Sequence, residues 1–261
     1  MARITKIMFY FFLVTVLAGC KSPEPKPIWE DIKIGDLAPP NQPTAQTMIK
    51  TINFNIEIID IPRDNAFVLE AIQKILPSVQ FEYSSQKAFA ENSFWVGFGD
   101  GDLWPQIANA LDQVKAKKIE TISLLLTDGQ YEDIAISELP RRTDLYYLSE
   151  QGTMEMVRLE NGQIAMRVKA TKAAGARGVC NFQAMPVYPL PGDTATQLSY
   201  GHKMGEVLFT PMFFEIDMTP RTFILLTPNK VVKGKSTPAG YFFDRDKYLR
   251  IYLIICEKVP D

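Results

Sequence analysis

Apolar and polar residues alternate along several stretches of this chain, and the first such stretch covers residues 50–60. Its apolar members are Ile52, Phe54, Ile56 and Ile58. Because successive side chains of a β-strand point to opposite faces, this alternation predicts a strand with one buried face. Alternation also predicts strands at 79–83 and 94–98, and an apolar run predicts another at 119–126.

Two other stretches have the three- to four-residue spacing of an amphipathic helix. The first opens at Pro62 and Asp64 and ends at Pro77, and its apolar stripe comprises Phe67, Val68, Ala71, Ile72, Ile75 and Leu76. The second begins near Asp102, with Pro105 in its first turn, and its inner face comprises Ile107, Ala108, Leu111 and Val114. The resulting order of elements predicts an α+β module over residues 49–126, with the split βαβ arrangement of ferredoxin-like folds.

From residue 127 onward the helical spacing disappears, and short strand patterns alternate with glycine and proline clusters. Asn161-Gly162, between residues 154–159 and 164–168, predicts a tight hairpin. Further strands are expected at 145–148, 179–187, 207–218, 223–227 and 248–256. In the last strand, the core-facing set should be Leu249, Ile251, Leu253 and Ile255. Short strands without helices predict an all-β sandwich or a partly closed barrel over residues 127–261.

The first nineteen residues have the layout of a secretory signal, because Arg3 and Lys6 precede an apolar run at 7–16. That run is too short to span a bilayer. It leads into Leu17-Ala18-Gly19-Cys20, which resembles the lipobox of bacterial lipoproteins. The resemblance implies cleavage before Cys20, acylation of this cysteine and a lipid-anchored protein of the bacterial cell envelope. A buried strand or short helix of a cytosolic fold is the alternative interpretation of the same run.

Residues 20–48 would follow the signal as a tether. They contain six prolines, which favour extended conformations: Pro23, Pro25, Pro27, Pro39, Pro40 and Pro43. The apolar residues among them would either dock on the folded part or form a small patch for a partner; they are Trp29, Ile32, Ile34 and Leu37. In some bacteria an aspartate after the modified cysteine resembles an inner-membrane retention signal. Lys21 stands here instead, which favours the outer membrane.

A second resemblance concerns residues 52–126. The strand Phe94-Trp95-Val96-Gly97-Phe98 is followed by a helix containing Leu111-Asp112 and by the strand that begins Ile119-Glu120-Thr121-Ile122. This succession resembles the small periplasmic modules of bacterial secretins, which pack side by side into rings. The resemblance implies a ring-building module and leaves the β-rich region unexplained. That region lacks the band of lipid-facing residues that a membrane-inserted secretin gate needs.

The net charge and the sequence motifs limit the kinds of binding and catalysis expected of this protein. The net charge of −2 gives no electrostatic basis for binding nucleic acid. His202 is the single histidine, and no nucleophile elbow accompanies it. Ser84 and Lys87 have the spacing of serine β-lactam-binding enzymes, but the companion motifs are absent. The sequence therefore predicts no catalytic residue, no metal site and no cofactor.

Two groups of residues remain as candidate sites. Cys180 and Cys256 lie in expected strands and would form either a disulfide, which export permits, or two buried thiols that act as small apolar side chains. Adjacent aromatic residues near the C-terminus would either fill the core or, together with a nearby cation, form an interaction patch for a protein or a glycan. These residues are Tyr241, Phe242, Phe243 and Arg245.

Together these observations predict a non-catalytic envelope lipoprotein that acts as a scaffold or assembly module. Its expected partners are the membrane, through the lipid on Cys20, and another envelope protein, which could belong to a secretin-like export machine. The alternative is an envelope-anchored hydrolase or ligand-binding protein whose site consists of scattered residues. The oligomeric state and the identity of the partner do not follow from the sequence.

Overall fold

The computed structural model describes residues 50–79, 83–140, 142–189 and 206–260. The expected signal peptide (1–19), Cys20, the tether (20–48) and His202 lie outside these residues. The described residues belong to one compact unit that starts at residue 49, and they form a β-rich α+β fold, as the sequence predicts coarsely. None of the described helices is long and apolar enough to cross a membrane.

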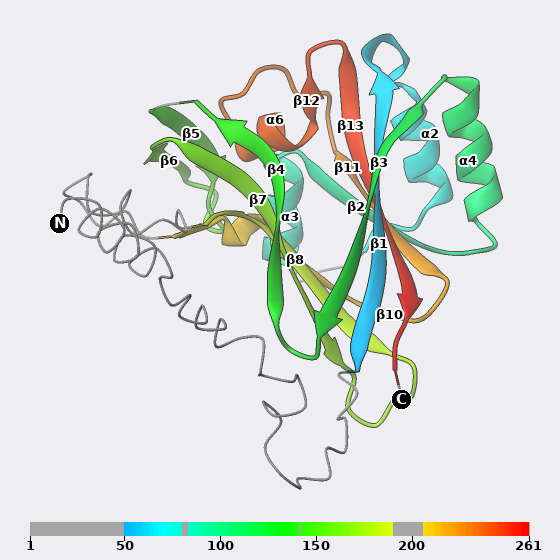
Figure 1. The fold of residues 1–261 in the computed structure, drawn as a ribbon. Coiled ribbons are helices and arrows are strands. Elements are labelled where there is room, and N and C mark those ends of the chain that lie inside the picture. Colours follow the sequence, from blue (N-terminus) through cyan, green and yellow to red (C-terminus); the bar gives the residue numbers. More distant parts are fainter. Residues whose placement is uncertain (1–49, 80–82, 141, 190–205, 261) are drawn as a thin grey trace, which may run out of the picture. The chain divides into compact units, whose positions relative to one another are not determined.

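The largest sheet, sheet A, has the strand order β2-β11-β13-β1-β3, and β12 pairs with β13 beside this path (Figure 1). Neighbouring strands in it run antiparallel. Its members are β1 (Thr51–Pro62), β2 (Phe94–Asp100), β3 (Lys117–Thr127), β11 (Thr222–Pro228), β12 (Asp244–Arg245) and β13 (Tyr248–Lys258).

Two smaller sheets complete the strands. Sheet B has the order β10-β8-β7-β4, with β9 paired to β8, and sheet C is the two-stranded pair β5-β6. The strands of sheet B are β4 (Tyr131–Leu139), β7 (Gly162–Lys172), β8 (Cys180–Tyr188), β9 (Val207–Leu208) and β10 (Phe214–Met218). The strands of sheet C are β5 (Thr143–Leu148) and β6 (Met154–Leu159).

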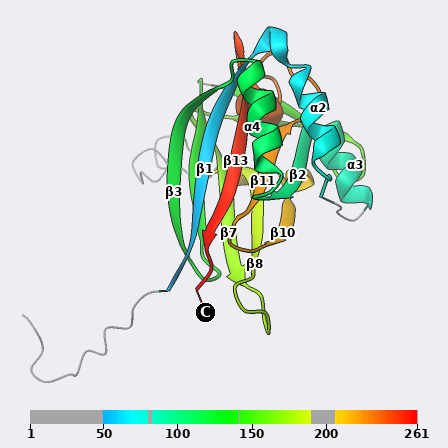
Figure 2. The ribbon, with the colours of Figure 1, turned by 90° about the vertical axis from the view of Figure 1, so that its right-hand side faces the viewer.

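Among the described residues, four α-helices and two 3-10 turns pack against these sheets. They are η3 (Arg63–Asn65), α2 (Val68–Ile75), α3 (Tyr83–Glu91), α4 (Trp104–Gln113), η4 (Thr210–Met212) and α6 (Pro238–Phe243). Helices α2 and α4 lie together on the outer face of sheet A (Figure 2). The ring of Trp104 meets that of Phe223 on this face, with centroids 5.8 Å apart.

Sheet B covers the opposite face of sheet A. Phe54 of β1 and Phe182 of β8 meet between the sheets, with ring centroids 5.0 Å apart. Sheet A is therefore the middle layer of the fold, with helices on one face and sheet B on the other. Two sheets pack face to face, but they are not the all-β sandwich expected for residues 127–261 alone, because sheet A combines strands from both halves of the chain.

The last strand, β13, has a different environment from the one expected. The set predicted to face the core is buried or packed against it: Leu249, Ile251, Leu253 and Ile255. Tyr252, Ile254 and Cys256, on the other face, are buried as well. A central strand between two layers buries both of its faces, so alternation along the sequence no longer separates inside from outside.

The boundary expected at residue 126 does not separate two cores. Strands β11 and β13 from the second half lie between β1 and β2 from the first half. The backbone of β1 needs hydrogen-bond partners on both edges, and β3 provides one edge while β13 provides the other. Residues 49–126 therefore do not complete a sheet by themselves.

The strand expected at 79–83 is absent from the described residues. Helix α3 begins at Tyr83, and only Ser78 forms an isolated bridge, with Gly97 of β2. Nearby, the backbone N–H of Val79 donates to the Val96 carbonyl over 3.1 Å. Residues 77–79 thus cover part of the outer edge of β2 instead of forming a strand that continues to residue 83.

The hairpin expected at Asn161-Gly162 is also wrong, because β6 and β7 belong to different sheets. Asn161 and Gly162 instead form the bend at which the chain leaves sheet C and enters sheet B. A Cβ atom on Gly162 would lie 2.7 Å from the ring of Tyr188, whose hydroxyl donates to the Asn161 carbonyl over 3.4 Å. The glycine is required here by the close approach of a buried ring, and a local turn signal in the sequence cannot be distinguished from that requirement.

Candidate functional site

The expected aromatic patch lies in the core. Thr237 caps α6 by accepting a hydrogen bond from the N–H of Gly240 over 3.2 Å, and the following rings, Tyr241, Phe242 and Phe243, are buried. Phe242 and Phe243 both contact Phe94, with centroids 5.4 and 5.0 Å apart. The sequence interpretation assumed a strand or loop here. A helix instead turns all three rings into the space beside β2 and β13.

Arg245 has a structural role beside this helix. Its guanidinium donates to the carbonyls of Tyr241, Asp244 and Ile136 at 2.8, 2.9 and 3.1 Å. Burial lowers the pKa of Arg245 below its usual value. The side chain therefore satisfies the C-terminal end of α6 and ties it to β4, so it does not extend from the surface to meet a partner.

The carboxylates of Asp244 and Asp100, which could offer oxygen ligands to a cation, accept hydrogen bonds within the protein. Asp244 accepts hydrogen bonds from the guanidinium of Arg63 and from the N–H groups of Gly234 and Asp246, at 2.7 and 3.1 Å for the two N–H groups. Asp100 accepts from two N–H groups at the start of α4. Within the described residues, no cluster of three or more His, Cys, Asp or Glu side chains could hold a metal ion.

One pocket lies on the outer face of sheet A, beside α4, with a volume of about 290 Å³. It is lined by Gly101, Trp104, Arg221, Phe223, Leu253, Ile255, Cys256 and Glu257. Arg221 has a φ of 75°, a conformation that costs energy for a residue with a side chain. The lining contains a single carboxylate, that of Glu257, which accepts a hydrogen bond from the Asn55 amide over 3.0 Å. The pocket can hold a small apolar group beside an arginine, and its lining offers no acid and base pair for catalysis.

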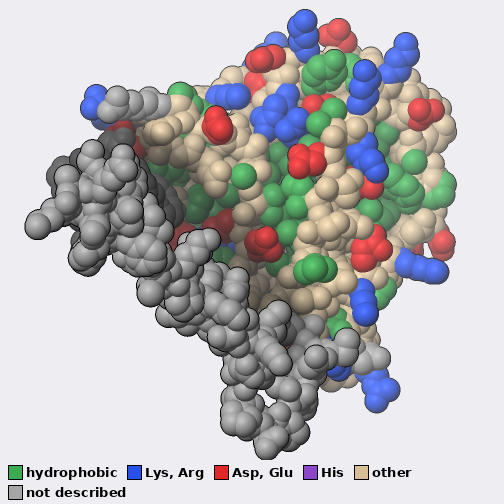
Figure 3. Space-filling model, in the orientation of Figure 1, with side chains coloured by type: hydrophobic (Ala, Val, Ile, Leu, Met, Phe, Trp, Pro, Cys, Tyr) green, Lys and Arg blue, Asp and Glu red, His purple; other side chains and the backbone are tan. Residues whose placement is uncertain are grey.

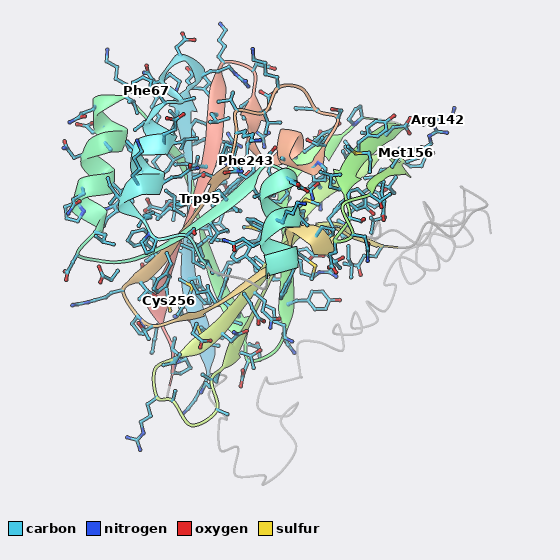
Figure 4. All side chains as sticks on the ribbon, turned by 180° about the vertical axis from the view of Figure 1, so that it is seen from behind. Phe67, Trp95, Arg142, Met156, Phe243 and Cys256 are labelled. Carbon is cyan, nitrogen blue, oxygen red and sulfur yellow. The ribbon has the colours of Figure 1, made fainter. Side chains whose placement is uncertain are left out.

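The β5-β6 hairpin presents the apolar surface that sequence reasoning missed. One face carries Tyr146, Met154 and Met156, which are 43%, 62% and 51% exposed. Tyr146 lies directly opposite Met156, so the rings and thioethers form one continuous face, which we call the hairpin face. Figure 4 shows Met156 and Arg142 at the outer end of the hairpin, remote from Trp95 and Phe67.

The opposite side of the hairpin is held by the body of the protein. Leu145 and Leu159 are fully buried, and Tyr147 meets Phe209 edge to face at 5.3 Å. The amide of Asn92, after α3, both donates to and accepts from the backbone of Leu148, each over 2.8 Å. Asn92 thus replaces a neighbouring strand at this point, and it fixes the hairpin to the core.

The outer edge of β6 has no strand partner among the described residues. On β5, the N–H groups of Tyr146 and Leu148 point away from β6, because they donate to Ser236 and Asn92. In an antiparallel pair the opposing residues do the same, so the backbone groups of Met154 and Met156 face outward. The hairpin therefore combines an exposed apolar face with an open strand edge.

The hairpin carries charged side chains of both signs. Asp144 and Arg158 neutralise each other through hydrogen bonds of 2.7 and 3.1 Å, which lower the pKa of Asp144. Glu155 accepts a hydrogen bond from the hydroxyl of Tyr147 over 2.6 Å. Lys, Arg, Asp and Glu side chains are likewise intermixed on the face of the molecule seen in Figure 3.

The sequence contains the alternation that produces the hairpin face, but it predicted that strand 154–159 pairs with 164–168 instead of with β5. Strands at 145–148 and 154–159 were expected, and Met154 and Met156 alternate along the second. Pairing that strand with 164–168 would have buried one of its faces. Pairing it with β5 leaves the methionines at the surface.

No family model, curated protein or solved structure matches this chain. Inference about its function therefore depends on its own residues and on their arrangement.

Proposed function

We propose that this protein is a non-catalytic lipoprotein of the bacterial cell envelope, anchored through Cys20, and that it binds another envelope protein through the β5-β6 hairpin. The observation that carries the proposal is the hairpin face, where Tyr146, Met154 and Met156 are exposed together. Exposed apolar side chains scattered over a surface are ordinary, but a contiguous group beside an open strand edge favours a binding surface.

The chemistry of the hairpin defines the partner. An extended segment of the partner adds to the open edge of β6 through main-chain hydrogen bonds, and its alternate side chains pack on the methionines. Residues 141–160 contain three arginines, Arg141, Arg142 and Arg158, and four acidic residues, Asp144, Glu150, Glu155 and Glu160, so the two signs nearly balance. A partner segment with apolar residues at alternate positions complements this surface.

Capture from membranes tests the binding surface. The full-length lipoprotein is cross-linked in cells and purified from solubilised membranes, either as wild type or as Met156→Asp. We expect wild type to retain a reproducible partner and Met156→Asp to lose it, because a charge cannot be packed against apolar side chains. Leu125→Asp is the matched control, because Leu125 is 63% exposed on β3, in another sheet. Equal capture by both variants contradicts the assigned surface, provided that circular dichroism finds both folded.

The anchor is tested separately. Cells that express the full chain and Cys20→Ser are labelled with a palmitate analogue and fractionated. We expect label and membrane residence for the wild type and loss of both for Cys20→Ser, because the acylated thiol is the attachment point. An intact residue 1 on protein recovered from the cytosol contradicts the envelope assignment, and label in the inner-membrane fraction contradicts the outer-membrane assignment.

A more specific version of this proposal is that the protein belongs to a secretin-like export machine. Helices α2 and α4 pack together, and β1 pairs with β3, as a split βαβ module of the ferredoxin-like type requires. Strands β11 and β13 interrupt the arrangement between β1 and β2. Electron microscopy of the purified lipoprotein tests this form: rings support it, and particles of one chain contradict it.

A ligand-binding role is the second candidate, and the pocket beside α4 favours it. Its apolar lining and Arg221 suit a short acyl chain that ends in a carboxylate. Calorimetry with octanoate tests the pocket. Saturable heat for the wild type that Arg221→Ala abolishes favours this candidate, and the absence of heat for both contradicts it.

A further inference from the structure

Cys180 and Cys256 come from different sheets and face each other across the core. Cys180 is the first residue of β8 in sheet B, and Cys256 lies near the end of β13 in sheet A. Phe54 lies opposite Cys256 in β1, and Phe182 lies two residues after Cys180 on the same face of β8. The rings of Phe54 and Phe182 touch, and this contact marks the place where the two cysteines approach.

The two thiols are neighbours in the core and are sealed from water. Both cysteines have no exposed surface, and both are free thiols in this structure. The interaction with the Cys256 thiol, followed by burial, raises the pKa of the Cys180 thiol. Phe54, opposite Cys256, and Phe182, beside Cys180, are in ring contact between the sheets, so the two cysteines lie at the same junction of sheet A and sheet B.

We propose that Cys180 and Cys256 form a disulfide that joins sheet A to sheet B in the exported protein. The inference rests on the proposed envelope location, because disulfides persist in oxidising compartments. A covalent S–S bond of about 2.05 Å requires the two sulfur atoms to approach each other from their present positions as free thiols.

The reaction is a thiol–disulfide exchange with an envelope oxidase that carries a catalytic disulfide. The thiolate of one cysteine attacks a sulfur atom of that disulfide and forms a mixed disulfide. The second cysteine loses its proton and attacks the mixed disulfide, which releases the oxidase as a dithiol. Two S–H bonds of this protein are broken and one S–S bond forms, while the two electrons and two protons pass to the oxidase. Because both thiols are fully buried in the fold, the exchange precedes final packing of the sheets.

The bond would close a loop from residue 180 to residue 256 that includes α6 and the strands β10 and β11. Cross-linking two distant residues restricts the unfolded chain, and more so for long loops. For a loop of this length in a chain of this size, reduction is expected to lower the melting temperature by roughly 10 °C.

The experiment uses the full-length lipoprotein, purified from membranes after free thiols have been blocked with an alkylating reagent under denaturing conditions. Peptide mass spectrometry without reduction is expected to find the peptides that contain Cys180 and Cys256 linked. Reductant should lower the melting temperature of the wild type and leave that of the double variant Cys180→Ala/Cys256→Ala unchanged. Alkylated cysteines at both positions in cell-derived protein overturn the proposal for the exported protein.

A second arm separates this inference from the proposed location. The same full-length chain is reduced, unfolded and refolded in a glutathione redox buffer. A disulfide that forms in the buffer but is absent from cell-derived protein supports the pairing of the two thiols and contradicts export. Thiols that stay free in both samples overturn the pairing itself.

Discussion

Strand β13 and the β5-β6 hairpin represent two opposite environments in one fold. β13 has a strand on each edge and a packed layer on each face, so Ile251, Leu253 and Ile254 are all buried. The hairpin strands have each other, one covered face and one exposed face. Stability is therefore expected to depend on β13, whereas the hairpin can tolerate changes at its surface and keep its fold.

Two arginine–aspartate pairs show the same difference in burial between the surroundings of β13 and the hairpin. Asp60 and Arg250, beside β13, form hydrogen bonds of 2.8 and 3.0 Å, and Asp144 and Arg158, on the hairpin, form bonds of 2.7 and 3.1 Å. The side chains of the first pair are only 10% and 18% exposed, but those of the second are 36% and 63% exposed. The hydrogen-bond lengths of the two pairs are similar, but the exposure of their side chains to water differs. Water screens the second pair and stabilises its charges when the pair is broken.

The largest expected effect contrasts single truncations in the two regions. Ile254→Ala removes a fully buried side chain between the sheets and is expected to lower the free energy of unfolding by about 2–5 kcal/mol. Met156→Ala on the hairpin face should change it by less than about 0.5 kcal/mol. Urea unfolding followed by circular dichroism measures both. A similar loss for the two variants would break the comparison.

The two ion pairs give the next effect. Asp60→Ala leaves Arg250 without its partner in a largely buried position, which is expected to cost about 3 kcal/mol. Asp144→Ala should leave the unfolding midpoint close to that of the wild type, because Arg158 remains in water. The measurement is the urea midpoint of each variant. A larger loss for Asp144→Ala than for Asp60→Ala would contradict this account.

A smaller effect is expected at Asn92, whose side chain fixes the β5-β6 hairpin to the rest of the protein. Asn92→Ala removes both hydrogen bonds to the backbone of Leu148, so we expect a loss of about 1–3 kcal/mol. The local consequence is faster amide hydrogen exchange in β5, without the same change in β13. Asn229→Ala is the control, because its amide donates to Ala90 and does not contact the hairpin. Unchanged exchange in β5 would show that Asn92 does not fix the hairpin.

The smallest effect is a dependence on alkaline pH within the hairpin. Burial, followed by the hydrogen bond to Glu155, raises the pKa of Tyr147 from 10.0 to about 12. The folded state then holds the phenolic proton more tightly than the unfolded state, so this contribution to stability is complete below pH 10 and is lost as pH rises through 12. Tyr147→Phe should therefore lose less stability than the wild type over this interval. The free energy of unfolding is measured in urea at about pH 9 and about pH 11, roughly a unit on either side of the ordinary tyrosine value. An equal loss between these two pH values for the wild type and for Tyr147→Phe would contradict this expectation.

Local patterns predicted many elements because those elements depend on neighbours in sequence. Alternation in 50–60 and 94–98 became β1 and β2, and the spacing of apolar residues around Ile72 and Ile107 became α2 and α4. Failures occurred where another segment decides the outcome. The turn signal at Asn161-Gly162 was overridden by the ring of Tyr188, and Tyr83, the last residue of the strand expected at 79–83, begins α3; residues 80–82 lie outside the described residues.

The sequence by itself determined where strands and helices can form and proposed the lipid anchor at Cys20. The tertiary structure alone decided which strands are neighbours. For example, β13, near the end of the described residues, pairs with β1, near their start. The strand pairings and the packing of the sheets together bury Tyr241, Phe242 and Phe243, place Cys180 and Cys256 in one core, and leave Met156 at the surface. Hydrogen bonding between strands is alike for every backbone, so the choice of partner depends on packing between side chains that are far apart in sequence.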